Sequence, residues 1–268
     1  MTLNYCIGRL RELTGKRNIF FTDRGNSSIL LSLKIAKSLG KKRLFLQDQG
    51  GWITYGQYGR QLKYDISGLE TDYGLILVKK LEGKLGPDSV LLMNSMPGYF
   101  ALQGNMKIIA NLCKKENSLL INDVSGSIGQ DDSRYGDLIV GSFGEWKPLE
   151  VGRGGFIAYD NAEYFAFFKE NFKKAPGDIF SVLRTQLNSL PQKTKGLYER
   201  QKTIKVQLKE FDIIHRSKKG FNVIIKHNDD GEKKKILDFC KLNGYEFTFC
   251  PRYIRVLEQA ISIEVKRK

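Results

Sequence analysis

The sequence predicts an α/β fold in which helices cover a mainly parallel sheet, followed by a smaller domain. Between residues 26 and 159, short apolar runs with strand character alternate with helical patterns, which is typical of parallel sheets. The chain has 268 residues, of which 41% are hydrophobic and 16 are Phe. This length suffices for one large domain with its own core and one small domain.

The first part of the chain contains the predicted sheet. Strand-like runs occupy residues 43–47, 74–79, 89–94, 118–122, 138–142 and 155–159. The clearest helical patterns cover residues 26–39 and 106–115. The connection between Lys147 and Gly155 is too short for a crossover helix. We therefore expect the strand at 155–159 to run antiparallel to the strand before it.

After residue 159 the character of the chain changes. Residues 161–174 look helical and carry four Phe, residues 174–192 read as a linker with a helix, and residues 193–211 are basic and helical. A strand at 220–227, a helix at 230–242 with an Asp cap, and strands at 247–256 and 260–266 follow. The predicted division is a large domain at 1–175, a linker and helix at 176–219, and a small α+β domain at 220–268.

The composition limits the classes of function. The net charge is +15, and residues 151–268 carry 24 basic and 14 acidic side chains. Such a basic half can attract nucleic acid or phosphate groups, but no recognised nucleic-acid module appears, which favours a solvated lysine-rich surface. The four cysteines are scattered and predict neither a metal site nor disulfides. With no apolar run of membrane-spanning length and no signal peptide at the start, we expect a cytoplasmic protein.

The segment at residues 136–158 carries the first candidate site residue. An apolar run ends at Gly141 and Ser142, Lys147 follows five residues later, and a turn rich in glycine leads into the next run. A lysine held between two strands by such turns can be partly desolvated, and desolvation favours the neutral, nucleophilic amine. Lys147 is therefore a candidate Schiff-base former, although in a lysine-rich chain it can equally be one more surface lysine.

Asp123 is the second candidate. It follows a strand-like run and precedes a turn of small residues, and in open α/β sheets ligands bind beyond the carboxyl ends of strands. A carboxylate and a lysine from neighbouring strand ends can flank one flat cofactor. The alternative for Asp123 is a turn or helix-capping aspartate, the commoner fate of Asp before Ser and Gly.

A third segment offers phosphate-binding chemistry. Gly25, Asn26, Ser27 and Ser28 precede a helical pattern, and the free amide groups and positive dipole at a helix N-terminus favour an anion. Most such caps bind only their own backbone. In the aromatic, glycine-rich loop at residues 47–58, which follows a strand, Trp52 and Tyr55 can stack on a flat ring or pack within a surface turn. Arg252 and Arg255 can bind a carboxylate or phosphate, although strand residues that face solvent are the commoner case.

Together these segments resemble the fold-type I pyridoxal-phosphate enzymes, and among them the DegT/StrS-type aminotransferases that act on keto-sugars. Over roughly residues 20–160 the order and spacing of four short motifs agree with that family. The matching stretches are 25–27 (Gly-Asn-Ser), 94–99 with Asn105 and Met106, 122–129 (Asn-Asp-Val-Ser-Gly-Ser-Ile-Gly), and Ser142-Phe143 with Lys147 followed by 152–155 (Gly-Arg-Gly-Gly). The resemblance implies a three-layer large domain with a mainly parallel sheet and a small C-terminal α+β domain.

The resemblance also implies a site and a reaction. Lys147 would carry pyridoxal 5'-phosphate, and Asp123 would pair with its ring nitrogen. Gly25, Asn26, Ser27 and Ser142 would hold the phosphate, and Trp52 would cover the ring. The expected reaction moves an amino group from an amino acid donor to a small keto substrate, in a homodimer whose interface buries the site.

Two departures from the family motivate another hypothesis. The His or Gln that the family places three residues after the aspartate is Gly126 here, and the chain is shorter than usual members. A catalytically degenerate member that serves as a binding or regulatory partner, with nucleic acid as one partner class, is therefore the alternative.

Overall fold

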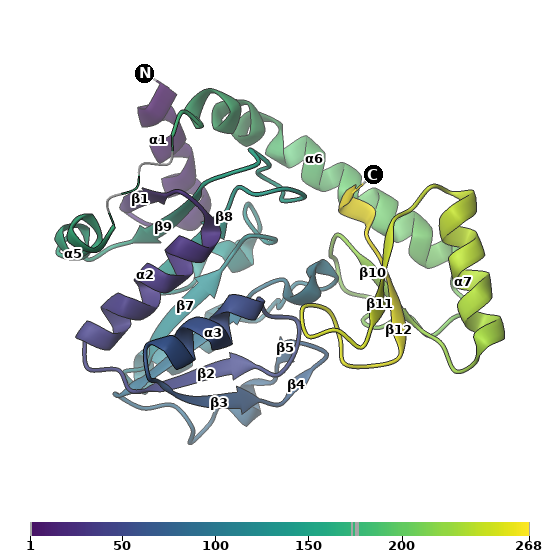
Figure 1. Ribbon diagram of the computed structural model, residues 1–268, viewed down its shortest axis with the longest axis horizontal. Coiled ribbons are helices and arrows are strands. Elements are labelled where there is room, and N and C mark those ends of the chain that lie inside the picture. Colours follow the sequence, from purple (N-terminus) through teal and green to yellow (C-terminus); the bar gives the residue numbers. More distant parts are fainter. Residues whose placement is uncertain (1, 173, 175–176, 268) are drawn as a thin grey trace.

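The computed structural model describes residues 2–172, 174 and 177–267, and it contains a seven-stranded sheet flanked by helices (Figure 1). The strand order is β3-β2-β6-β7-β8-β9-β1; β9 runs antiparallel to both of its neighbours, β8 and β1, and the other neighbouring strands are parallel. The predicted direction of the strand at residues 155–159 is thus confirmed. The strands are β1 (Asn18–Thr22), β2 (Arg43–Gln47), β3 (Asp65–Leu69), β6 (Ser89–Asn94), β7 (Leu119–Asp123), β8 (Leu138–Ser142) and β9 (Gly155–Tyr159).

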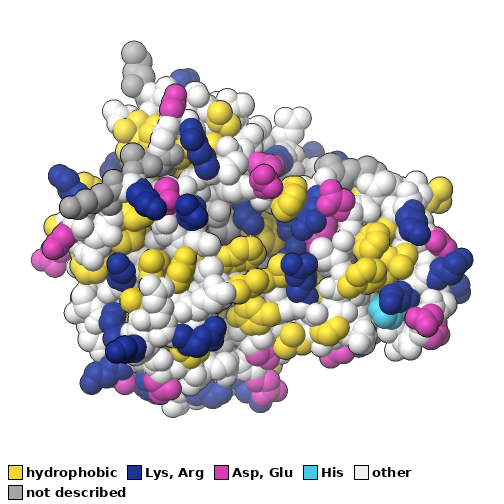
Figure 2. Space-filling model, in the orientation of Figure 1, with side chains coloured by type: hydrophobic (Ala, Val, Ile, Leu, Met, Phe, Trp, Pro, Cys, Tyr) yellow, Lys and Arg dark blue, Asp and Glu magenta, His cyan; other side chains and the backbone are white. Residues whose placement is uncertain are grey.

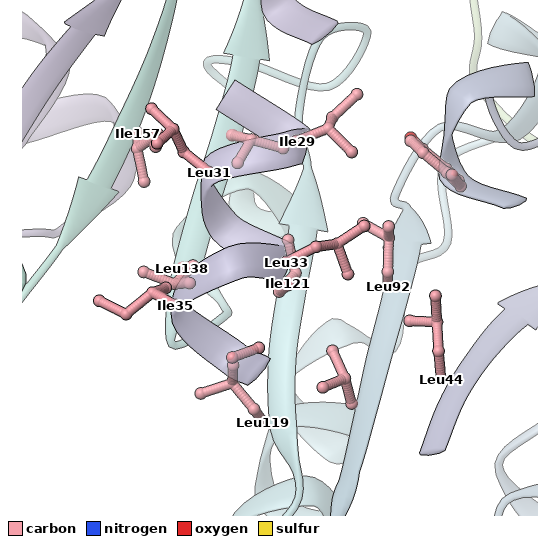
Figure 3. Packing of buried hydrophobic residues seen from close by; sticks show 14 of the residues in the cluster. Ile29, Leu31, Leu33, Ile35, Leu44, Leu92, Leu119, Ile121, Leu138 and Ile157 are labelled. Atoms are coloured by element: carbon pink, nitrogen blue, oxygen red, sulfur yellow. The ribbon is translucent and has the colours of Figure 1, made fainter. Parts of the chain in front are cut away.

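Helices cover both faces of this sheet because its strands are apolar on both sides. Along β6, Val90 and Leu92 face one layer, whereas Leu91 and Met93 face the other. The first layer packs α2 over the sheet, as Figure 3 shows for Leu31, Leu33 and Ile35. Its helices are α2 (Gly25–Ser38), α3 (Ile53–Gln61) and α5 (Tyr164–Asn171). The opposite layer contains α1 (Thr2–Thr14), α4 (Met106–Lys115) and the first half of α6 (Phe180–Gln207). The expected three-layer α/β arrangement is confirmed.

A second sheet lies in the C-terminal part. Strands β10 (Val223–Lys226), β12 (Ala260–Ile263) and β11 (Phe247–Cys250) are antiparallel, with β12 in the centre. Their apolar face packs on the second half of α6 and on α7 (Asp230–Leu242), and the Asp229 side chain caps α7 by accepting a hydrogen bond from the amide of Glu232 at 2.7 Å. Both parts of the molecule therefore share α6, which runs along them in Figure 1. The division at 175–176 lies outside the described residues and stays a prediction.

Several element predictions were wrong. Residues 74–79 do not form a sheet strand: they hold the two-residue strand β5 (Leu75–Ile76), paired with β4 (Thr71–Asp72), and a short 3-10 turn. The edge strand is instead β3, which lacks an apolar run because much of it is exposed. Residues 53–61 form α3 rather than a loop. The last two strands are shorter than predicted, and α1 and β1 were not predicted.

Helix α6 continues through Pro191, where the sequence pattern predicted a linker. Its buried side chains repeat at alternating steps of four and three residues on both sides of the proline, so one apolar stripe spans the whole helix. These side chains are Leu183, Leu187, Leu190, Thr194, Leu197, Gln201 and Ile204. Packing of this stripe against both sheets outweighs the single hydrogen bond that a proline removes.

Candidate active site

The candidate site is a cavity of about 210 Å³ at the carboxyl ends of the parallel strands. Asn94, Asp123 and Ser142 close β6, β7 and β8, and all three line the cavity. The N-terminus of α2, the segment 50–52 and two residues from the C-terminal part, Ile254 and Arg255, complete the wall. This is the edge of an open α/β sheet at which ligands bind.

Asp123 is buried, and two donors fix its carboxylate. The Tyr55 hydroxyl donates to Oδ2 at 2.6 Å, and the amide of Ser125 donates to Oδ1 at 2.9 Å. Burial raises the pKa of the Tyr55 phenol well above its usual value, and the Asp123 charge adds to this effect. Tyr55 therefore remains a protonated donor, and it holds the Asp123 carboxylate in one orientation towards the cavity.

Lys147 lies in the turn between β8 and β9 and lines the cavity as a half-buried side chain. Its Nζ lies 4.9 Å from the ring centre of Tyr99 and 5.6 Å from that of Trp52. The turn has a fixed shape: Gly152 and Gly154 adopt positive φ angles of 85° and 91°, which favour glycine. The Lys193 side chain of α6 donates to the Lys147 carbonyl at 3.2 Å, so α6 also anchors the turn.

The N-terminus of α2 forms the anion-binding end of the cavity. A Cβ on Gly25 would lie 2.5 Å from the Cβ of Ser142, so only glycine lets the helix approach the end of β8 this closely. Gly25, Asn26 and Ser142 all line the cavity, as predicted. Arg24, which precedes the helix, also lines the cavity, and its guanidinium lies 3.3 Å from the Asp23 carboxylate. The helix dipole favours a phosphate at this end of the cavity.

Ser27 and Trp52 show how local contacts select the residues that reach the cavity. The Ser27 hydroxyl donates to Asp23 at 2.6 Å, and Ser27 is not part of the cavity wall. Trp52 does line the cavity, and its Nε1 donates to Asn26 Oδ1 at 2.9 Å. The structure thus brings together six of the seven predicted site residues and turns Ser27 towards Asp23.

The space beside Gly126 is filled by another side chain. A Cβ on Gly126 would lie 2.9 Å from the Tyr99 ring and 3.3 Å from the Cβ of Met96. Tyr99 has a positive φ of 64°, which turns its ring into this space and into the cavity wall. The Tyr99 ring therefore fills the space that a side chain at position 126 would enter.

Arg255 does not face solvent: it is 4% exposed, lines the cavity and forms a two-pronged ion pair with Glu264. Both oxygen contacts measure 2.8 Å. Lys266 lies 3.4 Å from the same carboxylate and 3.7 Å from the Tyr99 ring centre. Although burial raises the pKa of Glu264, Lys266 and Arg255 hold it well below the usual range. Arg252, by contrast, is exposed.

The sequence motifs did not point to Arg24, Tyr99 or Ser125 as cavity or supporting residues, and they favoured a solvent-facing Arg255. Arg24 had a usable signal, because a cation directly before a helix N-terminus adds to its positive field. The Ser125 contact is local, since its amide donates to the carboxylate two residues before it. Tyr55 was expected to stack on a ring but instead bonds Asp123, which is 68 residues away in the sequence. Among the residues the structure describes, no group of three or more His, Cys, Asp or Glu could hold a metal ion.

Comparisons with known proteins identify the fold. The chain resembles PseC of Helicobacter pylori, an aminotransferase involved in the biosynthesis of pseudoaminic acid, with a TM-score of 0.77 and 15% identity over 98% of this chain and 85% of that one. It resembles a DegT DnrJ EryC1 StrS aminotransferase from Brucella abortus with a TM-score of 0.76 and 15% identity over 98% of this chain and 84% of that one. It resembles 3-amino-5-hydroxybenzoic acid (AHBA) synthase with a TM-score of 0.74 and 14% identity over 99% of this chain and 85% of that one. The chain thus has the fold of these aminotransferases.

The C-terminal part has a match of its own. Residues 191–267 match the family model described as the MJ1341 family C-terminal domain. This range begins inside α6 and includes the whole second sheet. A search of curated proteins found no match.

Proposed function

We propose that this protein is a pyridoxal-phosphate-dependent aminotransferase that moves an amino group from an amino acid to a keto acceptor, with keto-sugars as one acceptor class. The observation that carries the proposal is the convergence of Lys147, the buried Asp123 and the N-terminus of α2 on one cavity. An amine, a carboxylate and an anion site are the groups that a phosphorylated pyridine aldehyde requires. The fold shared with known aminotransferases supports the same conclusion.

Each residue has a role in this proposal. Lys147 would hold the cofactor, which would supply an electron sink when bound. The Asp123 carboxylate would keep the pyridine nitrogen protonated, since a nearby negative charge favours the charged form. The Lys147 Nζ would also move a proton at the substrate Cα. The amides of Gly25 and Asn26, with Ser142, bind the phosphate, and Trp52 covers the ring.

One part of the cavity wall suits the amino donor. There Arg255 forms an ion pair with the buried carboxylate of Glu264, which Lys266 and Arg267 also contact. Arg255 reaches the cavity wall and can bind a substrate carboxylate. An amino acid supplies such a group. The likeness to PseC of Helicobacter pylori, an aminotransferase involved in the biosynthesis of pseudoaminic acid, supports a keto-sugar acceptor.

The proposal includes a reducing compartment, the cytoplasm, because all four cysteines are free and buried. No helix in the described part of the chain is both long and apolar enough to span a membrane. The proposal also includes a homodimer, because the cavity mouth carries exposed hydrophobic side chains.

The absorption spectrum of the protein with pyridoxal phosphate tests the proposal. We expect a band at the visible edge that borohydride removes, and peptide mapping should then place the pyridoxyl group on Lys147. The Lys147→Ala variant should lose the band, whereas Lys107→Ala, an exposed lysine on α4, should keep it. An adduct on another lysine, or none at saturating cofactor, would contradict the proposal and favour a binding role without catalysis.

A further inference from the structure

A second concave surface lies away from the candidate active site, along the second half of α6. It is a groove of about 530 Å³ between α6 and the segment 216–219. Its wall shares no residue with the wall of the cavity that contains Lys147. The residues that line it are Tyr198, Glu199, Gln201, Lys202, Lys205, Val206, Lys209, Arg216, Ser217, Lys218 and Lys219.

The groove is strongly positive. Six of its lining residues are Lys or Arg, and its single carboxylate, Glu199, lies 3.9 Å from Lys195 outside the groove. Among the residues the structure describes, none of these six cations lies within ion-pair distance of a carboxylate. At longer range, Lys218 interacts with the carboxylate of Asp132. Burial raises the pKa of that carboxyl overall, and the charge of Lys218 partly offsets this increase. So many unpaired cations in one concavity attract an anion with several charges.

The floor of the groove is rigid. Lys205 is 9% exposed, and its Nζ donates to the Lys218 carbonyl at 2.6 Å. The Gln201 side chain accepts a hydrogen bond from the amide of Gly220 at 3.0 Å, and the amide of Leu102 donates to the Lys219 carbonyl at 2.8 Å. These bonds hold segment 216–219 against α6 and against the large sheet's loops. The cations are therefore presented from fixed backbone.

The unpaired charge is concentrated in this groove rather than spread along α6. The neighbouring cavity, between α1 and α6, shares Lys219 with the groove, but its other cations are paired, Arg9 with Glu12 and Lys195 with Glu199. An extended polyanion such as RNA gains from a continuous unpaired track, whereas a compact ligand needs only one positive concavity. The size of the groove also suits a small molecule.

We propose that this groove binds a compact polyphosphate ligand of nucleotide size. Its phosphates would contact Lys202, Lys209, Arg216 and Lys218. Its flat, less polar part would lie on Val206, which is 61% exposed, and on the apolar stems of the lysines. The site is independent of the proposed aminotransferase chemistry.

Calorimetric titration with ATP tests the proposal, with inorganic triphosphate and adenosine as comparison probes. We expect one ATP per chain, weaker binding of triphosphate and no binding of adenosine. Lys202→Glu/Lys209→Glu changes two exposed cations and should raise the Kd for ATP at least about tenfold. The matched control Lys107→Glu/Lys169→Glu makes the same change in net charge on exposed helical residues elsewhere and should leave the Kd within about twofold.

Three outcomes would overturn the proposal. Equal weakening by both double variants would show unspecific attraction to a basic protein. Competition between ATP and saturating pyridoxal phosphate would place ATP in the other cavity. Failure of ATP to bind, with affinity for single-stranded RNA that rises with length, would assign the surface to nucleic acid. The first and third outcomes do not depend on whether pyridoxal phosphate reacts with Lys147, so the two proposals fail separately.

Discussion

Asp123 combines burial with a fixed orientation. The Tyr55 hydroxyl of α3 donates to one carboxylate oxygen and the amide of Ser125 donates to the other, so neither oxygen can turn away from the cavity. A buried carboxylate with remaining lone pairs requires a further donor or a positive charge to offset its desolvation. A protonated pyridine nitrogen supplies both.

We predict that Asp123→Asn still attaches pyridoxal phosphate to Lys147 but loses transamination by on the order of 10²–10³-fold, because a neutral amide stabilises a developing positive ring poorly. Absorbance and single-turnover kinetics measure the two properties. Tyr55→Phe, which removes only the hydroxyl that orients Asp123, should lower the rate less and leave cofactor attachment intact. Near-normal turnover of Asp123→Asn would remove Asp123 from the proposed site.

Lys205 gives a prediction on pH. Burial lowers its pKa from 10.5 to about 8, with Arg216 adding to the effect. Between about pH 8 and 10.5 the unfolded chain therefore binds more protons at this position than the native state does. The contribution of Lys205 to stability rises with pH across that window.

Urea unfolding at pH 7 and pH 9.5 measures this contribution as a difference between variants. The free energy of unfolding of wild type, relative to Lys205→Met, should increase from pH 7 to pH 9.5. Lys202→Met, at an exposed position on the same helix, is the control and should show no such change relative to wild type. The same pH response in both variants would refute the assignment to Lys205.

At the scale of single residues, the sequence was informative where a motif is local. Lys147, Asp123 and Ser142 could be predicted because strand ends and glycine turns show in a short window. Tyr99 and Arg255 could not, since their positions depend on how the segment at 96–100 and the C-terminal part fold against the large sheet. Ser27 was placed by its position in the motif, but a neighbouring carboxylate at Asp23 takes its hydroxyl.

Among the elements, α2 is positioned by the close approach of its first residue, Gly25, to the end of β8, and the sequence of α2 alone does not reveal this contact. We predict that Gly25→Ala destabilises the fold by roughly 1–3 kcal/mol, since the added methyl group would meet Ser142 at 2.5 Å. It should also weaken the binding of pyridoxal phosphate, because the helix end must shift away from the cavity. Chemical denaturation and cofactor titration measure the two effects.

Gly196→Ala is the matched control for that substitution. Gly196 lies on an exposed face of α6, and an added Cβ would meet no atom within 4 Å. Alanine there should stabilise the protein by about 0.5–1 kcal/mol through helix propensity and leave cofactor binding unchanged. If Gly25→Ala behaved like Gly196→Ala, the close packing of α2 on β8 would not matter for the site.

Elements with strong local signals could be predicted well. Helices at 106–115 and 230–242 and strands at 43–47, 89–94, 138–142 and 155–159 have the predicted bounds. The elements that were predicted wrongly depend on tertiary structure. β3 is an edge strand without an apolar run, and α6 continues through a proline because it packs against both sheets. In α3, Gly59 gives no helical signal but lets the helix lie close to Leu44, because a Cβ there would meet that side chain at 2.7 Å.

For the whole molecule, the distribution of apolar surface is the informative feature. Figure 2 shows hydrophobic side chains gathered on the face between the large sheet's helices and the C-terminal part. Four exposed apolar side chains belong to the cavity wall or to segments that adjoin it: Trp52, Ile53, Trp146 and Leu257 are 37%, 48%, 41% and 53% exposed. The amide of Leu257 donates to Gln49 at 2.9 Å, beside the segment 50–52 of the wall. Clustered apolar side chains of this kind mark an interaction surface.

We predict that this surface forms the interface of a symmetric homodimer that closes the site. Light scattering at micromolar concentration should give twice 30.6 kDa. Ile53→Asp places a charge in the proposed interface and should produce monomers with weaker cofactor binding, since a buried unpaired charge is costly. The control Ile108→Asp changes a residue of α4 that is 55% exposed and should leave the dimer intact.

The combination of mass and cofactor binding then separates the remaining interpretations. A wild-type monomer that binds and turns over pyridoxal phosphate would show that one chain closes its own cavity, with Trp52 and Tyr99 shielding Lys147 from water without a partner. A wild-type monomer that binds no cofactor would favour the degenerate, non-catalytic alternative. A dimer that Ile53→Asp disrupts with loss of cofactor binding would tie the exposed rim to the chemistry, because burial of these side chains would then be needed to exclude water from the cavity.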